Sequence, residues 1–446
     1  MNEQLEFKGF WFLPNYPENR VAGILTYIPH ETIKLELIGY FESEKSFIDS
    51  ISDHNKIDII LGNASNGKKI TIIYCIPSSS YNSESDFPIT TYECTYLIIG
   101  KHLNDIFENC FNRATVLFSE LKYWCLPNAI IEMMKYNKNE ELNKVSFLIN
   151  TKNKRIINST IIDDNTTLSL KECIVYFEPE CYFDKSLNQY TSLEISKKEA
   201  SSIKDFMKDI YLYEQFLSFA TLRRVICSNI QLTDQNCNQE ICNPIQFIYI
   251  HREFDNNAQP KRYQFLFDYE KIKSQYSYII RKWYTEDDDI VPIRQHLIDS
   301  IKVTKVFSSV DFLIVEQAIE GFWWRFRDRD YKSNNKNNDS VSKKTNTSLK
   351  EIFEELISEF ASVTKIANLN LNIDSVVDSR HYYSHFMNKK NKRNIADGLE
   401  LFYLSRKLKV ILICCMMNFM GLSNIQINDI LEKSYNTIFE NILKDN

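Results

Sequence analysis

Two patterns of apolar residues divide this chain. From residue 8 to about residue 195, short runs rich in β-branched and aromatic residues alternate with clusters of Asn, Ser, Gly, Pro and Asp. Such runs predict strands joined by turns. Five of them are GILTYI, TIKLELIGYF, KIDIIL, KITIIYCI and ECTYLII. A β-sandwich or a curved sheet is the packing that such a series of strands favours.

The apolar spacing changes further along the chain. Residues 199–221 have helical spacing and are followed by two predicted strands, IQFIYI and YQFLFDY. From about residue 270 the helical period dominates. We predict helices over residues 269–283, 292–329, 348–369, 373–386, 395–420 and 425–443. Ser348 with Glu351 three residues later has the pattern of a capping box, and Gly421 stands where a helix-ending glycine is expected.

These patterns predict an α+β protein of two domains. Residues 1–270 form a strand-rich, β-sandwich-like N-terminal domain, and residues 271–446 form an all-α helical bundle. The polar segment 331–347 predicts a mobile surface loop between two helices. The apolar run 410–422 has thirteen residues where a membrane span needs about 20, so it predicts a buried helix and no membrane partner.

The composition narrows the class of protein and its expected location. The 446 residues are 44% hydrophobic and 25% charged with a net charge of −6, which is typical of a globular protein. The 11 cysteines form no CxxC pair and predict reduced thiols, and the N-terminus MNEQLEFKGF has no signal-peptide pattern, so a cytoplasmic location is expected. With only 9 glycines and no phosphate-loop or GxSxG pattern, nucleotide hydrolysis and lipase-like hydrolysis are not expected.

One segment of the helical part carries candidate chemistry. Arg380 and His385 are separated by four residues on the predicted helix 373–386. An offset of five residues turns two side chains about 140° apart on an ideal helix, so the pair needs help to converge. His381 shares a face with His385, and Ser384 shares one with Arg380.

With this spacing the segment resembles the HEPN ribonucleases, whose hallmark is Arg-x4-6-His on a helix of a small bundle. The flanking runs VDFLIVEQAIEGFWWRF and GLELFYLSRKLKVIL and the turn MGLSN narrow the resemblance to Apea-like HEPN domains. Proteins of this kind carry a strand-rich ApeA N-terminal domain and act against phage. His381 departs from the family pattern, in which a polar residue such as Asn often follows the arginine.

The chemistry of these residues fits metal-independent endoribonuclease activity. Such cleavage needs a base for the ribose 2′-hydroxyl, an acid for the 5′-oxygen and positive charge beside the phosphate. We assign His385, a group with an ordinary pKa of about 6.5, the acid/base role, and Arg380 the role of stabilising charge and positioning substrate. The expected products are a 2′,3′-cyclic phosphate and a 5′-hydroxyl end. No cofactor and no metal are expected.

The resemblance also implies partners and a biological role. It implies a homodimer in which motifs from two copies form one site, tRNA as the RNA cleaved, and an abortive-infection toxin that halts translation. We expect the N-terminal domain to restrain the helical domain until a phage component binds.

Several neighbours of the motif are candidates for supporting roles. Tyr382 and Tyr383 could stack on an unpaired base, and Glu320 with Glu316 could orient His385 or Arg380. RNA phosphates could be bound by a basic run and by lysines of the preceding loop. These residues are Lys389, Lys390, Lys392 and Arg393, with Lys332, Lys336, Lys343 and Lys344 in the loop.

Each of these interpretations has an alternative. Arg380 and His385 could be a surface or core pair, and His381 with His385 could ligate a metal, although no third ligand is evident. The basic run could be a solvated turn, and the two glutamates could be ordinary polar-face residues. The run WWRFR at residues 323–327 invites a nucleic-acid interpretation, but aromatic residues at helical spacing favour a core segment. At the level of function, the alternative is an inactive HEPN-like module that binds RNA or dimerises behind a ligand-binding N-terminal domain. A second alternative makes the strand-rich domain the active part and the helical region an oligomerisation stem.

Overall fold

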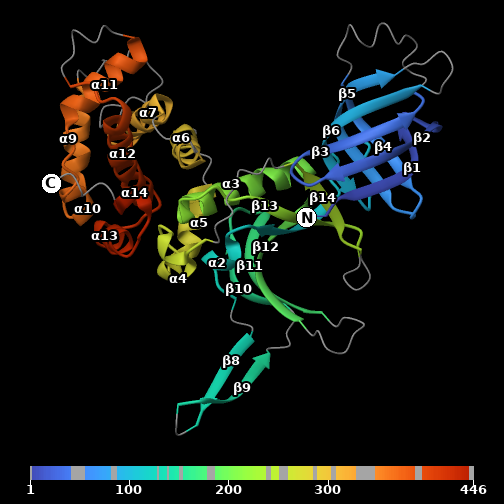
Figure 1. Cartoon of the computed structure of the whole chain (residues 1–446), viewed down its shortest axis with the longest axis horizontal. Helices are drawn as coiled ribbons and strands as arrows, with labels where there is room; N and C mark the ends of the chain where they lie inside the picture. The colour runs from blue at the N-terminus through green and yellow to red at the C-terminus, as the bar shows by residue number, and fades with distance from the viewer. Residues whose placement is uncertain are drawn as a thin grey trace. The chain divides into compact units, whose positions relative to one another are not determined.

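The chain forms two compact units, each with its own core. The computed structural model describes residues 3–41, 56–81, 88–127, 130–137, 140–149, 154–177, 186–237, 243–250, 260–284, 289–302, 308–327, 347–386 and 394–440. The first unit comprises residues 1–122, 126–211 and 226–259, and the second comprises residues 123–125, 212–225 and 260–446. The predicted class, strands first and helices after, is confirmed (Figure 1). The predicted domain boundary at residue 270 stays a prediction.

Within the described part of the first unit, six antiparallel strands close into a barrel. They are β1 (Leu5–Leu13), β2 (Tyr16–Ile28), β3 (Thr32–Ile38), β4 (Ile57–Ala64), β5 (Lys69–Tyr81) and β6 (Ile89–Ile99). Their order is β6-β3-β2-β1-β4-β5, and β5 pairs with β6 to complete the ring (Figure 1). The β-sandwich-like part of the prediction therefore takes the form of a closed barrel.

The barrel interior follows from the alternation of side chains along each strand. In β3, Ile33, Leu35 and Leu37 are buried, whereas Lys34 and Glu36 between them point outward. The interior of the barrel contains Phe7, Trp11, Leu25, Tyr27, Ile33, Leu35, Leu37, Ile60, Ile70, Ile72, Tyr92, Leu97 and Ile99. A Cβ atom on Gly62 would lie 2.3 Å from the ring of Trp11, so only glycine leaves room for this indole.

Strand β6 also belongs to a second, open part of the sheet. One edge of β6 pairs with β3 through residues 89–93 and with β14 (Ile245–Tyr249) through residues 96–99. The sheet continues from β14 through β13 (Cys227–Asp234), β7 (Phe111–Phe118), β12 (Ser186–Ser201), β11 (Thr166–Phe177) and β10 (Lys154–Ile161). The predicted strand IQFIYI is confirmed as β14.

Helix α3 (Ile203–Thr221) follows β12 directly. Its start was predicted at residue 199, but residues 199–201 still belong to β12. The helix begins later because Ser202 and Asp205 exchange hydrogen bonds across its first turn: the Asp205 backbone N–H donates to the Ser202 hydroxyl at 3.3 Å, and the Ser202 N–H donates to the Asp205 carboxylate at 3.1 Å.

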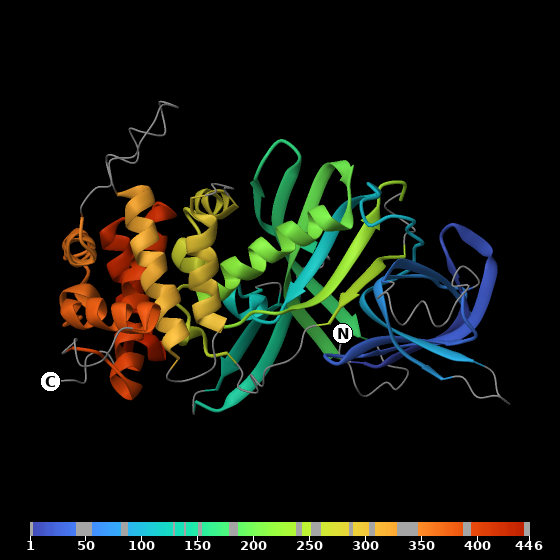
Figure 2. The same ribbon diagram turned by 90° about the horizontal axis from the view of Figure 1, so that it is seen from above.

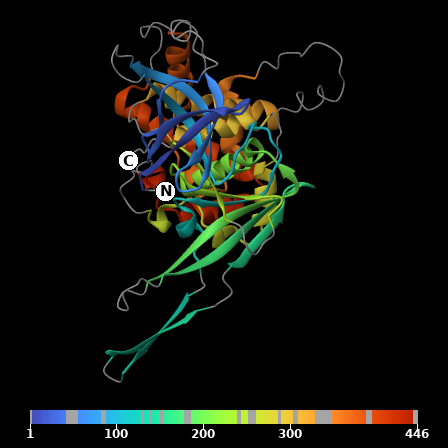
Figure 3. The ribbon, with the colours of Figure 1, turned by 90° about the vertical axis from the view of Figure 1, so that its right-hand side faces the viewer.

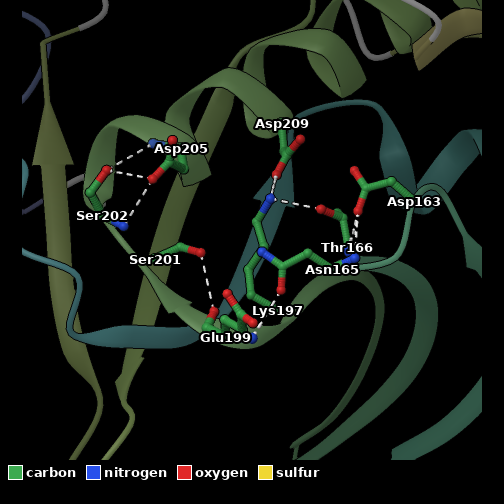
Figure 4. Close-up of polar contacts among 9 residues, drawn as sticks. All are labelled: Asp163, Asn165, Thr166, Lys197, Glu199, Ser201, Ser202, Asp205 and Asp209. Carbon is green, nitrogen blue, oxygen red and sulfur yellow. Dashed lines mark hydrogen bonds and ion pairs between the residues drawn. The ribbon is translucent and has the colours of Figure 1, made fainter.

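A buried ion pair fastens the first half of α3 to the sheet (Figure 4). Lys197 Nζ lies 2.5 Å from Asp209 Oδ2 and donates to the Thr166 hydroxyl at 2.9 Å. The turn between β10 and β11 is held to β12 by Asn165, whose side-chain oxygen accepts from the Glu199 N–H at 2.9 Å. These contacts join the helix, β12 and this turn in one polar network.

A separate two-stranded ribbon belongs to the first unit. Strands β8 (Ile130–Tyr136) and β9 (Leu142–Ile149) pair with each other in a sheet of their own (Figures 1 and 3). Their turn is closed by the Asn137 N–H, which donates to the Glu141 carbonyl at 2.9 Å. Exposed apolar side chains of the ribbon are Met133, Met134, Tyr136, Leu142, Val145 and Leu148.

The second unit is helical (Figure 2). After α2 (Leu121–Trp124) and the end of α3, its elements are η1 (Arg262–Gln264), α4 (Tyr269–Ile272), α5 (Tyr276–Tyr284), α6 (Val291–Lys302), α7 (Ser309–Phe326), α9 (Leu349–Glu359), α10 (Thr364–Ala367), α11 (Ile373–His385), α12 (Gly398–Phe419), α13 (Asn424–Glu432) and α14 (Thr437–Glu440).

Capping residues explain where the observed helices depart from the predicted ones. The predicted helix 292–329 is two helices, because Ser308 caps a new helix by accepting from the Asp311 N–H. The predicted helix 395–420 starts at Gly398, since Asp397 is its N-cap. The capping box of Ser348 and Glu351 is confirmed, but α9 ends at Glu359 and α10 follows. The predicted helix 425–443 is likewise divided into α13 and α14. The loop predicted over residues 331–347 lies almost wholly outside the described residues.

The predicted strand YQFLFDY is wrong. Its central residues Phe265, Leu266 and Phe267 are buried in the helical unit without belonging to a sheet. Their backbone finds other partners: the Phe267 N–H donates to the Ala220 carbonyl at 3.1 Å, and the Phe265 carbonyl accepts from the Ser434 hydroxyl at 2.9 Å. An apolar run that is buried on all sides does not need a strand partner when other parts of the chain supply these hydrogen bonds.

Aromatic side chains from distant parts of the chain form one core of the second unit. Trp283 stacks on Phe219 with ring centres 5.6 Å apart and donates to the Leu212 carbonyl at 2.8 Å. Trp124 donates to the Phe267 carbonyl at 3.0 Å. These contacts explain why residues 123–125 and 212–225 belong to the helical unit.

Helix α12 has its C-terminal half buried in the core of the second unit. Leu408, Ile411, Leu412 and Cys415 are fully buried, so the apolar run is a core helix as predicted. None of the helices that the structure describes has the length and apolar character needed to cross a membrane.

Trp323 of α7 is buried, and its indole N–H donates to Glu355 at 2.7 Å, which confirms the core interpretation for this tryptophan.

Most of the described cysteines are free and buried, as predicted. They are Cys75, Cys94, Cys110, Cys125, Cys173, Cys227, Cys414 and Cys415. The prediction is wrong for Cys237, which is disulfide-bonded.

Candidate functional site

Helix α11 carries both residues of the Arg-x4-His motif. The Asn372 side chain caps its start by accepting from the Ser375 N–H at 3.1 Å, and Phe386, in the left-handed conformation, ends it after His385. Val376 and Ser379 turn one face into the bundle. The motif is thus placed on a short helix with defined ends, as predicted.

Arg380 extends from α11 to two glutamates of α7. Its Nη2 atom donates to Glu320 Oε2 at 3.3 Å, and its Nε atom lies 3.8 Å from Glu316 Oε1. The Arg380 side chain keeps 27% of its surface exposed. One guanidinium is therefore placed between two carboxyl groups and still reaches solvent.

Glu316 is fully buried in the middle of the apolar stripe of α7. Phe312, Ile319 and Trp323 lie on the same stripe and are buried as well. Within the described residues, neither carboxylate oxygen of Glu316 has a hydrogen-bond donor. Burial and the neighbouring Glu320 raise the pKa of Glu316 to about 8, while Arg380 acts in the opposite direction. This carboxyl holds its proton at neutral pH.

His385 occupies a different environment. It is the last residue of α11 and is exposed, with its ring centre 6.1 Å from that of His381 one turn earlier. In the described part of the chain, no hydrogen bond or ion pair joins Arg380 to His385. Because both residues lie on the regular helix α11, the offset of five residues turns them to different sides, as expected.

Ser384 and Tyr383 make contacts within the helical unit. The Ser384 hydroxyl donates to the Arg380 carbonyl at 2.5 Å, which places the two residues on one face as predicted. The Tyr383 hydroxyl donates to the Ala396 carbonyl at 3.1 Å, and its ring meets Phe312 edge-on. Burial and Asp397 raise the pKa of Tyr383 to about 12. These contacts favour a structural role for Tyr383, and base stacking by Tyr382 and Tyr383 stays a prediction.

Two features of the site were not anticipated from the sequence. Ser379 is buried, and its hydroxyl accepts from the Ala396 N–H at 2.9 Å, which fastens α11 to the segment before α12. Glu316 was considered an ordinary polar-face residue, and its burial corrects that interpretation. Its place among Phe312, Ile319 and Trp323 is the sequence signal that could have revealed it.

The predicted RNA-binding residues belong to two segments beside α11 and α9 in the sequence. Lys389, Lys390, Lys392 and Arg393 lie outside the described residues, and so do the lysines of the preceding loop. Among the described residues, no three His, Cys, Asp or Glu side chains gather in a way that could hold a metal ion. Catalysis without a metal stays a prediction.

The arrangement offers two complementary functions at one helix. An exposed imidazole can exchange protons, and a partly exposed guanidinium, held by carboxyl groups, can bind an anionic oxygen. A phosphodiester is a substrate that uses both functions.

Comparison with protein families agrees with this division of the chain. Residues 6–283, more than half of the chain, match the model for ApeA N-terminal domain 1, and residues 313–426 match the model for Apea-like HEPN. The second match contains α11 with Arg380 and His385. Neither the curated proteins nor the solved structures include a match to this chain.

Proposed function

Because the chain belongs to the ApeA family, with an ApeA N-terminal domain followed by an Apea-like HEPN domain, we propose that it is a metal-independent endoribonuclease. The observation that carries the proposal is the placement of Arg380 and His385 on α11 inside the HEPN match. Arg380 positions the scissile phosphate and stabilises its developing charge, and His385 transfers protons. Attack by the ribose 2′-hydroxyl leaves a 2′,3′-cyclic phosphate and a 5′-hydroxyl end.

The substrate in this proposal is RNA with an unpaired loop, and tRNA is the class that the family resemblance implies. An unpaired nucleotide can place its 2′-hydroxyl in line with the phosphorus, which a stacked duplex does not allow easily. Cleaved tRNA would stop translation in an infected cell, so the protein acts as an abortive-infection effector in the cytoplasm. The N-terminal domain restrains it until a phage component binds.

Growth and RNA integrity test the proposal together. Wild type, Arg380→Ala, His385→Ala and the control His296→Ala on α6 would be induced with and without phage, and total RNA would be separated on a denaturing gel. His296 is a half-buried histidine away from the motif, so it controls for the loss of an imidazole. Growth arrest with discrete tRNA fragments is expected for wild type and His296→Ala only. Equal growth and intact RNA in all four strains would contradict the proposal.

A homodimer is part of the proposal, supported by the divergence of Arg380 and His385 on one helix. If a site takes its arginine from one copy and its histidine from the other, a mixture of Arg380→Ala and His385→Ala protein contains dimers with one complete site. We expect this mixture to recover a measurable fraction of wild-type cleavage. Mixtures as inactive as either variant alone would contradict a shared site.

If the purified wild type binds RNA but does not cleave it under any of these conditions, the alternative of an inactive RNA-binding module is favoured instead.

A further inference from the structure

The charges around Arg380 do not balance if every group is ionised. Arg380 contributes one positive charge, whereas Glu316 and Glu320 would contribute two negative charges within 4 Å of it. A site with this balance would repel the phosphodiester that it is proposed to bind. The burial of Glu316 resolves the conflict.

Three observations indicate that Glu316 is uncharged in the folded protein. Its side chain has no exposed surface, and no donor among the described residues reaches its oxygens. Its distance of 3.8 Å to Arg380 Nε is longer than a hydrogen bond, and Glu320 one turn away adds repulsion. An ionised carboxylate without donors is costly to bury, so the protonated form is favoured.

Among the residues that the structure describes, charged groups of the other neighbouring helices do not act on Glu316. Helices α6, α9, α11 and α12 all pack against α7. From α12, Lys409 pairs with Asp311 at 2.9 Å, and from α9, Glu359 pairs with Arg327. Glu355 of α9 accepts from Trp323, and the α6 contact to Asp311 comes from the uncharged Ser300. The charged groups that act on Glu316 are thus Glu320 and Arg380.

Resting on the proposed function, we infer that Glu316 is a positioning residue of the Arg380 site, which supports the guanidinium as an uncharged carboxyl and thereby keeps the site open to a phosphate anion. With Glu316 neutral, Arg380 and Glu320 sum to zero, and an approaching phosphate meets an unopposed donor edge of the guanidinium. With Glu316 ionised, the same site carries a net negative charge.

The inference gives Glu316 an effect on substrate binding that a purely structural residue would not have. Above pH 8, where Glu316 ionises, KM for RNA should rise about tenfold for each pH unit in the wild type, with little change in kcat. Glu316→Gln, which is neutral at every pH, should keep KM within about threefold of the wild type at pH 7 and should remove the alkaline rise.

The experiment measures KM and kcat of the full chain, purified from phage-infected cells so that any restraint is released, on a fluorescent RNA from pH 6.5 to 9.5. Glu316→Met, another uncharged side chain of similar volume, is made in parallel in case the glutamine variant does not fold. Circular dichroism verifies the fold of each variant. An alkaline rise in KM that persists in both variants overturns the inference, and so does a KM at pH 7 that increases more than tenfold in a folded Glu316→Gln.

A binding measurement separates this inference from the proposed function. A 2′-O-methyl RNA stem-loop lacks the attacking hydroxyl and is not cleaved, and its affinity is measured by fluorescence anisotropy over the same pH range. If the wild type cleaves no RNA but its affinity weakens above pH 8 and that of Glu316→Gln does not, the ribonuclease proposal fails and the role of Glu316 stands. If wild-type affinity has the same pH dependence as the variant, the inference fails whether or not RNA is cleaved.

Discussion

Arg380 and Glu320 meet across two helices, with Nη2 of the arginine 3.3 Å from Oε2 of the glutamate. The contact fixes one end of the guanidinium, so the orientation of its remaining N–H groups is defined before any substrate binds. Preorganised donors of this kind stabilise developing charge without rearrangement at the moment of reaction.

The fork geometry of Arg380 predicts that lysine cannot replace it. Arg380→Lys keeps the positive charge but has one point of contact, so it cannot bind Glu320 and a phosphate oxygen side by side. We expect kcat/KM for RNA cleavage to fall about 100-fold, a loss of about 2.7 kcal/mol of transition-state stabilisation. Steady-state cleavage at pH 7 measures it, and a lysine variant within threefold of the wild type would contradict the prediction.

The protonation of Glu316 predicts a pH dependence of stability. The pKa of Glu316 is about 8 in the folded chain against an ordinary value of 4.5, so the folded state holds a proton that the unfolded state releases between these two values. Stability from this group is present below pH 4.5 and is lost as the pH rises toward 8, by up to about 1.4 kcal/mol per pH unit.

Chemical denaturation at pH 5, 6, 7 and 8 tests this sign. Relative to the wild type, Glu316→Gln should become steadily more stable as the pH rises. Glu354→Gln, an exposed glutamate of α9, serves as the control and should follow the wild type. A constant difference between wild type and Glu316→Gln across the series would exclude a protonated Glu316.

Replacing Ser379 by alanine should lower the stability of the helical unit around α11. Ser379→Ala removes the acceptor of the Ala396 N–H, a buried contact of 2.9 Å, and leaves this donor unpaired. The expected cost is about 1–3 kcal/mol of unfolding free energy. Thermal unfolding measures this loss. Ser375→Ala, at a partly buried serine of α11 whose hydroxyl has no partner among the described hydrogen bonds, is the control and should lose less stability. A Ser379→Ala variant as stable as the wild type would show that Ala396 finds another acceptor.

Replacing Gly421 by alanine should cause a steric contact in addition to backbone strain. It has a φ of 90° just after α12, and a Cβ atom there would lie 2.4 Å from the Tyr278 ring. Gly398 also has a positive φ, of 53°, but a Cβ atom there would meet nothing within 4 Å. Both alanine variants should lose about 1 kcal/mol from the left-handed backbone. Gly421→Ala should lose up to about 1 kcal/mol more, because the half-exposed ring of Tyr278 has to move aside. Equal melting temperatures for the two variants would contradict the clash.

The sequence allowed the helices with strong caps to be predicted, but not the ends that depend on packing. Ser348 with Glu351 and Gly421 act locally, so their roles follow from spacing alone. The segment YQFLFDY has the composition of a strand, yet its backbone partners are Ala220 and Ser434, far away in sequence. Propensity could not indicate those partners.

For the candidate site too, local patterns were predictable and contacts that depend on packing were not. Arg380 and His385 were identified because a motif is a local pattern, and the contact between Arg380 and Glu320 agrees with the expectation that Glu320 could orient Arg380. The burial of Glu316 was missed because glutamate is seldom fully buried, so its polar character outweighed its position in the apolar stripe of α7. That its oxygens find no donor among the described residues depends on packing between helices, which the spacing along one helix does not reveal.

Strand β14 belongs to the open part of the sheet, yet its residue Ile248 is part of the barrel core. A slip of one residue along β6 would withdraw Ile248 and turn the neighbouring Phe247 or Tyr249 inward. Packing of the barrel core therefore fixes the register in which β14 pairs with β6. The barrel and the open sheet can unfold together, but β14 cannot shift to a new pairing while the barrel stays packed.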